Sequence, residues 1–173
     1  MKSPQDMVRD FHEKFGYSMS PAEPELREGD LRANLVAEEA AEVVVALVGV
    51  ARAQTIVVGQ LMKVVEKAVR ARKDKPDLAE ALKELCDLLY VTFGSMETFG
   101  LTYAEAMAVF AEVHRANMDK KPGNRDENGK TVKGEGWVPP DIDAILRRIV
   151  ESRIAVAEYG KCTCPTFCGG ACF

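Results

Sequence analysis

Apolar residues recur at intervals of three and four along most of this chain, and strand-like alternation is scarce. That interval keeps apolar side chains on one face of an α-helix. The sequence therefore predicts an all-α fold. Helices are expected over residues 4–15, from 24 or 26 to about 50, and over 77–99, 102–118 and 139–159. The second of these either continues beyond residue 50 or is followed by another helix, in both cases to residue 72.

Glycines and capping side chains set the expected boundaries. Gly49 and Gly59 are the expected breaks in the long helical stretch that follows residue 24. Asp77 suits an N-cap, and Thr102, with Glu105 three residues later, has capping-box spacing. The prolines at 139–140 are placed in the first turn of the last helix. Residues 1–159 are expected to form one domain, followed by a cysteine-rich tail over 160–173.

Composition narrows the class of protein. Hydrophobic residues make up 47% and charged residues 29% of the chain, which is ordinary for a soluble globular protein. A net charge of −4 gives no general attraction to nucleic acid. No apolar run approaches the roughly 20 residues that span a bilayer, and the first residues lack the apolar core of a signal peptide. A cytoplasmic protein with no membrane partner is expected.

Acidic side chains interrupt the apolar stripes of two expected helices. Glu38, Glu39 and Glu42 occupy one arc of the helix that ends near residue 50, and apolar residues share this arc. Glu84 and Asp87, at i and i+3, project side by side from the 77–99 helix, again among apolar neighbours.

Two apolar faces in one small bundle are expected to meet and to bring these five carboxylates together. Uncompensated, such a cluster is costly, and a hard divalent cation removes the cost. Oxygen-only ligation suits Mg²⁺ or Mn²⁺. The alternative is that the acids lie on solvated faces paired with lysines. A di-iron bundle is disfavoured because neither His12 nor His114 lies in a Glu-x-x-His motif.

The segment 119–138 has no helical period, and a loop of this length is usually functional or disordered. Trp137 is expected to anchor it, and it is a candidate lid over phosphates. Arg125 and Lys133 of this segment are interpreted mainly as solubilising residues. The candidate substrate-binding residues are Arg115, Asn117, Lys120, Lys121 and Lys130 for the phosphates, and Phe11, His12 and Tyr90 for the base.

The tail is a separate feature. It contains Cys162, Cys164, Cys168 and Cys172 within the last 12 residues. A structural zinc site, disulfides and free thiols remain open for these cysteines.

The acid pattern Glu38-Glu39-x-x-Glu42 followed by Glu84-x-x-Asp87 resembles the metal motif of the MazG-like all-α NTP pyrophosphatases. The segments 11–16, 88–94, 109–120 and 129–142 extend this likeness over roughly residues 5–150. The chain looks closest to the short phage-type branch with MazZ-like and dUTPase-like members. One departure is the long gap between the two acid sets, which an inserted helix around 55–72 would explain.

The resemblance implies a four-helix-bundle core and hydrolysis of a (d)NTP, with dGTP or GTP first, to (d)NMP and pyrophosphate. It implies metal ligation by Glu39, Glu42, Glu84 and Asp87, with Glu38 orienting or deprotonating the water. A homodimer or homotetramer, in a host cytoplasm if phage-encoded, is expected. Alternatives are a dUTP or dCTP pyrophosphatase, a hydrolase cutting at the γ-phosphate, and a non-catalytic helical binding module.

Overall fold

The computed structural model describes residues 2–17, 28–71, 75–127 and 129–159. Within them the chain forms helices α1 (Pro4–Phe15), α2 (Gly29–Val48), α3 (Val50–Arg70), α4 (Leu78–Thr98), α5 (Tyr103–Met118) and α6 (Ile142–Tyr159). A single bridge between Arg125 and Thr131 is the only β-type pairing among the described residues. The prediction of an all-α fold is confirmed. The cysteine tail lies outside the described residues.

Local capping explains the helix ends that the sequence predicted. Asp77 accepts hydrogen bonds from the backbone amides of residues 79 and 80, at 2.8 and 3.2 Å, and so caps α4. Thr102 and Glu105 form the expected capping box of α5. Gly49 separates α2 from α3 with φ of 75°, a conformation that glycine adopts at little cost.

Three boundaries differ from the prediction. Glu28 adopts the left-handed conformation, with φ of 51°, so α2 begins at Gly29, whereas the expected start at 24 or 26 lies outside the described residues. Gly59 does not interrupt α3. The last helix begins at Ile142 because Asp141 accepts a hydrogen bond from the amide of Ala144 at 2.9 Å, so the prolines precede the helix.

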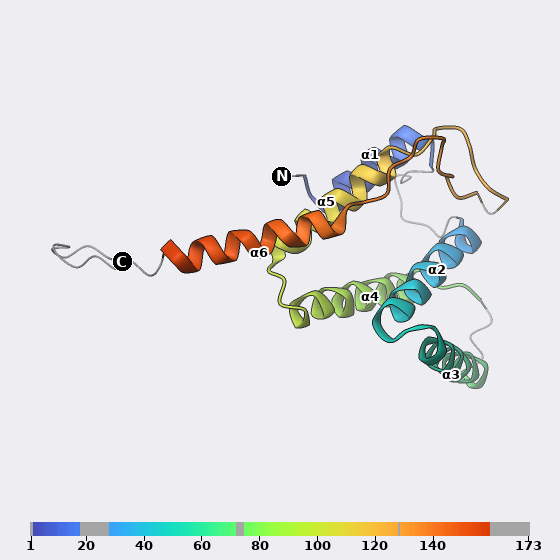
Figure 1. Cartoon of the computed structure of the whole chain (residues 1–173). Helices are drawn as coiled ribbons and strands as arrows, with labels where there is room; N and C mark the ends of the chain where they lie inside the picture. Colours follow the sequence, from blue (N-terminus) through green and yellow to red (C-terminus); the bar gives the residue numbers. More distant parts are fainter. Residues whose placement is uncertain (1, 18–27, 72–74, 128, 160–173) are drawn as a thin grey trace, which may run out of the picture.

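Helices α1, α5 and α6 form one group, here called the body, with α5 in contact with both α1 and α6 (Figure 1). Most of the buried apolar side chains belong to it, including Met7, Phe15, Met107 and Ala116. Arg153 of α6 binds Glu105 at 2.8 Å through Nε. This guanidinium, together with Thr102, lowers the pKa of Glu105 to about 2. The body therefore has its own core and its own ionic link.

Helices α2, α3 and α4 form the second group, here called the arm (Figure 1). Helix α2 contacts α3, whereas α4 makes no extensive contact with any other described helix. No described residue of α2 or α4 is buried, and Ala53 is the one buried residue of α3. None of the described helices is long and apolar enough to cross a membrane.

Candidate active site

Two adjoining cavities lie between the body and the first turns of α2. The lysine cavity, of about 480 Å³, is lined by Glu38 of α2 and by Lys120, Lys130 and Lys133 of the loop after α5. Positive groups therefore come from the loop and the negative group comes from the helix. A cavity with several ammonium groups suits a polyanionic ligand such as a phosphate chain.

The aromatic cavity, of about 260 Å³, opens beside the first. It is lined by Phe11 and His12 of α1, by Tyr17, and by His114 of α5. The Phe11 and Tyr17 rings are stacked with centroids 5.7 Å apart and planes 22° apart. Aromatic faces with imidazole nitrogens at their edge can both stack on a heterocycle and hydrogen-bond to it.

The two cavities share part of their lining, so they form one continuous site. The shared residues are Leu35, Lys120, Lys130 and Thr131. Lys120 Nζ lies 5.9 Å from the centre of the Phe11 ring, at the junction. Glu39 also reaches the aromatic cavity. A ligand with an aromatic end and an anionic end fits this order of surfaces.

The surroundings of the site shift the pKa values of two of its lysines. Lys130 Nζ binds Glu38 Oε2 at 2.6 Å, and this hydrogen bond raises the pKa of Lys130, with further support from the charges of Glu39 and Glu42. Burial lowers the pKa of Lys120, and repulsion from Lys130 and Lys133 lowers it further. An arriving anion would therefore favour the charged form of the half-buried Lys120.

The loop is tied to the end of α1 by hydrogen bonds that no helical period predicts. The Tyr17 hydroxyl accepts from the Thr131 amide at 2.8 Å, lies 2.8 Å from Thr131 Oγ1 and donates to the Gly129 carbonyl at 3.1 Å. Arg125 donates to the carbonyls of Phe15 and Gly16, both at 3.0 Å, and its guanidinium stands 4.2 Å from the centre of the Tyr17 ring.

These contacts correct the interpretation of Arg125 as a solubilising residue, because it joins the loop to the C-terminal end of α1. Lys133 likewise lines the lysine cavity and lies 4.4 Å from the centre of the Trp137 ring. Trp137 Nε1 donates to the Ala116 carbonyl at 2.7 Å, so the prediction that it anchors the loop is confirmed. The loop is thus held against the body at both of its ends.

Replacing Tyr17 by Phe is expected to destabilise the fold by about 1–3 kcal/mol, because the buried Thr131 amide and hydroxyl lose their partner. The midpoint of thermal unfolding should fall by several degrees. Tyr103→Phe, which removes a hydroxyl from an exposed ring, is the matched control and should leave the midpoint unchanged. Equal midpoints for the two variants would show that the Tyr17 hydroxyl does not hold the loop.

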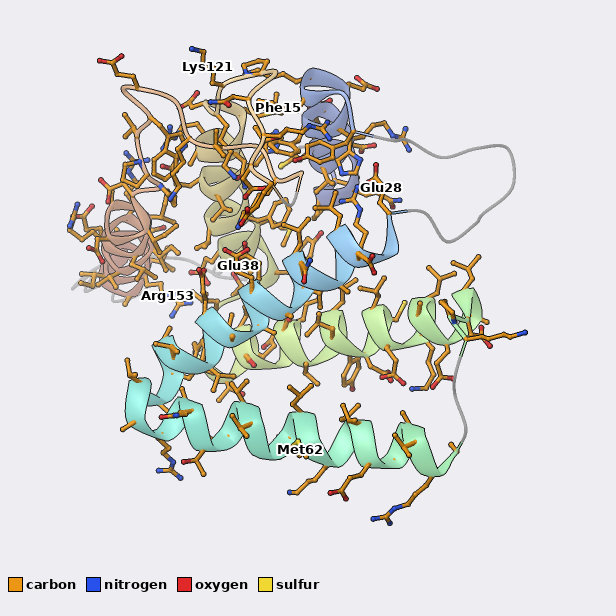
Figure 2. The ribbon with its side chains drawn as sticks, turned by 90° about the vertical axis from the view of Figure 1, so that its right-hand side faces the viewer. Phe15, Glu28, Glu38, Met62, Lys121 and Arg153 are labelled. Carbon is orange, nitrogen blue, oxygen red and sulfur yellow. The ribbon has the colours of Figure 1, made fainter. Side chains whose placement is uncertain are left out.

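The structure brings together some of the sequence-predicted residues. Those that line the joined cavities are Phe11, His12, Glu38, Glu39, Asn117, Lys120 and Lys130. Three others lie elsewhere. Lys121 is exposed and lies beyond the end of α5 at Met118 (Figure 2). Arg115 binds Glu112 and Asp119, at 2.8 and 2.6 Å. Tyr90, on α4, is 81% exposed.

The five acids do not converge within one chain as expected. Glu38, Glu39 and Glu42 are exposed on α2, while Glu84 and Asp87 are exposed on α4 and both bind Lys83 Nζ, at 2.7 and 2.8 Å. Within the described residues, no three acidic, histidine or cysteine side chains are grouped so as to hold one metal ion. The carboxylate donors suit Mg²⁺ or Mn²⁺ in chemistry, but one chain does not assemble them.

Sequence reasoning missed several lining residues. Phe110 and His114 share one face of α5 with Asn117, at i, i+4 and i+7, so helical spacing was a usable signal. Tyr17 and Thr131 carried no such signal, because they meet across 114 residues of sequence.

The described helices form a fold that is shared by a solved all-α protein of the pyrophosphohydrolase type. The crystal structure of a "putative NTP pyrophosphohydrolase" from Exiguobacterium sp. 255-15 has the same fold, with a TM-score of 0.66 and 24% identity over 88% of this chain and 98% of that one. No curated protein sequence matches the chain.

Residues 8–117 match the model of the phosphoribosyl-ATP pyrophosphohydrolase family, and the chain belongs to this family. The protein is therefore classed as a hydrolase of pyrophosphate bonds. The expected resemblance to all-α MazG-like enzymes is confirmed at this level.

Proposed function

We propose that the protein hydrolyses a purine nucleoside triphosphate between its α- and β-phosphates, releasing the monophosphate and pyrophosphate. The observation that carries the proposal is the continuity of the lysine cavity with the aromatic cavity, with Glu38 lining the first and Glu39 lining the second. The phosphate chain would lie along Lys120, Lys130 and Lys133, and the base beside Phe11 and Tyr17.

Binding of the phosphates would also free a general base. In the structure Lys130 Nζ donates a hydrogen bond to Glu38 Oε2. A triphosphate that binds Lys130 in place of Glu38 would leave the Glu38 carboxylate able to accept a proton from a water molecule. The water oxygen then bonds to a phosphorus of the α–β bridge, the bridging P–O bond breaks, and its electron pair leaves with the departing phosphate group.

The proposed cofactor is Mg²⁺, or Mn²⁺, held by Glu39, Glu42, Glu84 and Asp87. A bound divalent ion supplies charge neutralisation at the phosphates and a more acidic water. In the structure the Lys83 ammonium group forms ion pairs with Glu84 and Asp87, so metal binding there would displace it. A structural Zn²⁺ on the tail cysteines stays a separate prediction.

The identity of the nucleotide base is proposed from the resemblance of the chain to known families. The phage-type branch, which is part of this proposal, favours dGTP or GTP, while the family model favours phosphoribosyl-ATP. All three are purine nucleotides with a triphosphate chain. His12 and His114 line the aromatic cavity and are suited to read the edge of the base. A pyrimidine enzyme acting on dUTP or dCTP is the alternative within the same reaction.

A product assay tests this proposal. The protein is incubated with Mg²⁺ and, separately, each dNTP and NTP and phosphoribosyl-ATP, and the nucleotide products and pyrophosphate are measured. We expect monophosphate and pyrophosphate in equal amounts, fastest with a purine substrate. Diphosphate with inorganic phosphate would identify cleavage at the γ-phosphate instead.

A non-catalytic binding module is the competing function. It predicts binding of nucleotide without turnover and no thermal stabilisation by Mg²⁺ alone, because a binder needs no metal site. Turnover of no nucleotide in the product assay, together with an unchanged unfolding midpoint in Mg²⁺, would replace the enzyme proposal by this one.

A further inference from the structure

Arg32 is a charged residue of the aromatic cavity to which the proposed reaction gives no role. It lies near the start of α2 and lines the aromatic cavity, but it does not line the lysine cavity. The central carbon of its guanidinium group lies 5.7 Å from the centre of the Tyr17 ring, which is within the range of a cation–π contact. A permanent positive charge therefore lies beside the rings proposed to hold the base.

The helical spacing of α2 divides its residues between the two cavities. One face, at i, i+3 and i+7, lines the aromatic cavity and consists of Arg32, Leu35 and Glu39. The adjoining face, with the same spacing but beginning one residue earlier, lines the lysine cavity and consists of Leu31, Asn34 and Glu38. Arg32 therefore belongs to the part of the site that is proposed for the base, and not to the part that is proposed for the phosphates.

The guanidinium group of Arg32 is oriented by Glu28. Arg32 Nη2 donates to Glu28 Oε2 at 3.0 Å, and Glu28 lies at the end of α2 that is nearest to α1 (Figure 2). The Arg32 side chain is 39% exposed, so water screens its charge less than the charge of a fully exposed arginine. A guanidinium group has five N–H donors in a fixed planar fork. The ion pair with Glu28 uses only part of them.

A fork of donors selects a base by the acceptors on its edge. Guanine and hypoxanthine present O6 and N7, two neighbouring acceptors that match the guanidinium group bidentately. Adenine has an amino group in place of O6, and this amino group is itself a donor. Because a guanidinium group has no acceptor and keeps its proton, it cannot pair with that amino group. Cytosine and uracil lack N7, so they offer at most one acceptor at the corresponding edge.

We propose that Arg32 selects the base, and that the substrate is a 6-oxopurine nucleoside triphosphate. Arg32 donates to O6 and N7 of a base that stacks beside Phe11 and Tyr17. This assignment rests on the proposed function, and it narrows the substrate from purine nucleotides in general to those with an oxygen atom on carbon 6. ATP is then a poor substrate, although its phosphate chain is the same.

A set of nucleotides that differ at one edge of the base tests the proposal. The ratio kcat/KM is measured for GTP, inosine triphosphate, 7-deaza-GTP and ATP. Inosine triphosphate keeps both O6 and N7, whereas 7-deaza-GTP keeps O6 and lacks N7. For the native protein we expect similar values for GTP and inosine triphosphate, and values lower by about 10- to 100-fold for 7-deaza-GTP and ATP.

Arg32→Gln should change the preference between bases. A glutamine amide pairs with N6 and N7 of adenine, so the ratio of kcat/KM for GTP to that for ATP should fall by about tenfold or more. Arg70→Gln is the matched control, because Arg70 also forms an i, i+4 ion pair, with Glu66 at 3.3 Å, and lines neither cavity. It should keep the native ratio. If Arg32 had only a structural role, Arg32→Gln would lower kcat/KM for both nucleotides by the same factor, and that result would overturn the proposal.

Binding measurements separate base selection from the proposed reaction. Dissociation constants for GTP and ATP are measured by isothermal titration calorimetry in EDTA, which removes the metal that turnover is proposed to need. The native protein should bind GTP about tenfold or more tightly than ATP, and Arg32→Gln should remove this difference. If this holds while no nucleotide is hydrolysed in Mg²⁺, the proposed function fails and base selection by Arg32 is retained. Equal affinities of the native protein for GTP and ATP, or no binding of GTP, would overturn base selection even if hydrolysis occurs.

Discussion

Glu39→Gln is expected to lower kcat by at least about a thousandfold, with little change in the unfolding midpoint measured without metal. The substitution keeps the size of the side chain and removes one negative charge from the proposed Mg²⁺ ligands. Loss of one group that stabilises transition-state charge commonly costs a factor of about 100 to 1,000, and binding of the proposed Mg²⁺ would also be weakened. Because Glu39 is exposed on α2, the fold does not depend on its charge.

Two measurements separate loss of chemistry from loss of structure. Initial rates with the preferred nucleotide give kcat, and thermal unfolding with and without Mg²⁺ reports metal binding. Glu151→Gln, an identical change on α6, should keep native rates. If Glu39→Gln retained activity within about tenfold of the native protein, the α2 acids would not be ligands and the metal proposal would be withdrawn.

Lys120→Met is expected to lower kcat/KM by about 100- to 1,000-fold, since one positive group facing the phosphate chain is lost. The half-buried position of Lys120, at the junction of the two cavities, makes its charge less screened than that of a surface lysine. Lys121→Met is the neighbouring control, and it should have a small effect because Lys121 lines neither cavity. Equal losses in the two variants would mean that the substitutions act by disturbing the loop.

The lowered pKa of Lys120 adds a pH signature. Burial and the neighbouring lysines disfavour the charged form, so the native kcat/KM should begin to fall at a pH below the ordinary lysine value of 10.5. Lys120→Met should lack this alkaline limb. Rising pH has the opposite effect on stability, because the Lys120 ammonium group holds its proton more tightly in the unfolded chain than in the folded one. The contribution of Lys120 to the free energy of unfolding therefore rises as pH increases from its lowered pKa toward 10.5.

Local signals predicted most of the helices. Asp77, Thr102 and Gly49 act within a turn of their own position, so the chain around them determines the helix end. The start of α2 was predicted too early because nothing in the sequence reveals the left-handed backbone at Glu28. The start of α6 was early because either a proline or Asp141 can begin a helix, and Asp141 does.

The candidate site was harder to predict. Helical spacing placed Glu38 and Glu39 on one helix face. The anchoring of the loop by Tyr17 depends on contacts between distant segments, which no periodic pattern encodes. The position of α4 was predicted wrongly for a similar reason. Two apolar helices of one chain were expected to meet, whereas the described residues of α4 are not buried against any other helix.

The bare arm also sets the order in which the helices of one chain are expected to open. Helices α2 and α4 have no buried side chain, whereas most of the buried apolar residues belong to the body. Local opening costs least free energy where few apolar contacts are buried. In hydrogen exchange, the backbone amides of α2 and α4 of an isolated chain are therefore expected to exchange before those of α1 and α5.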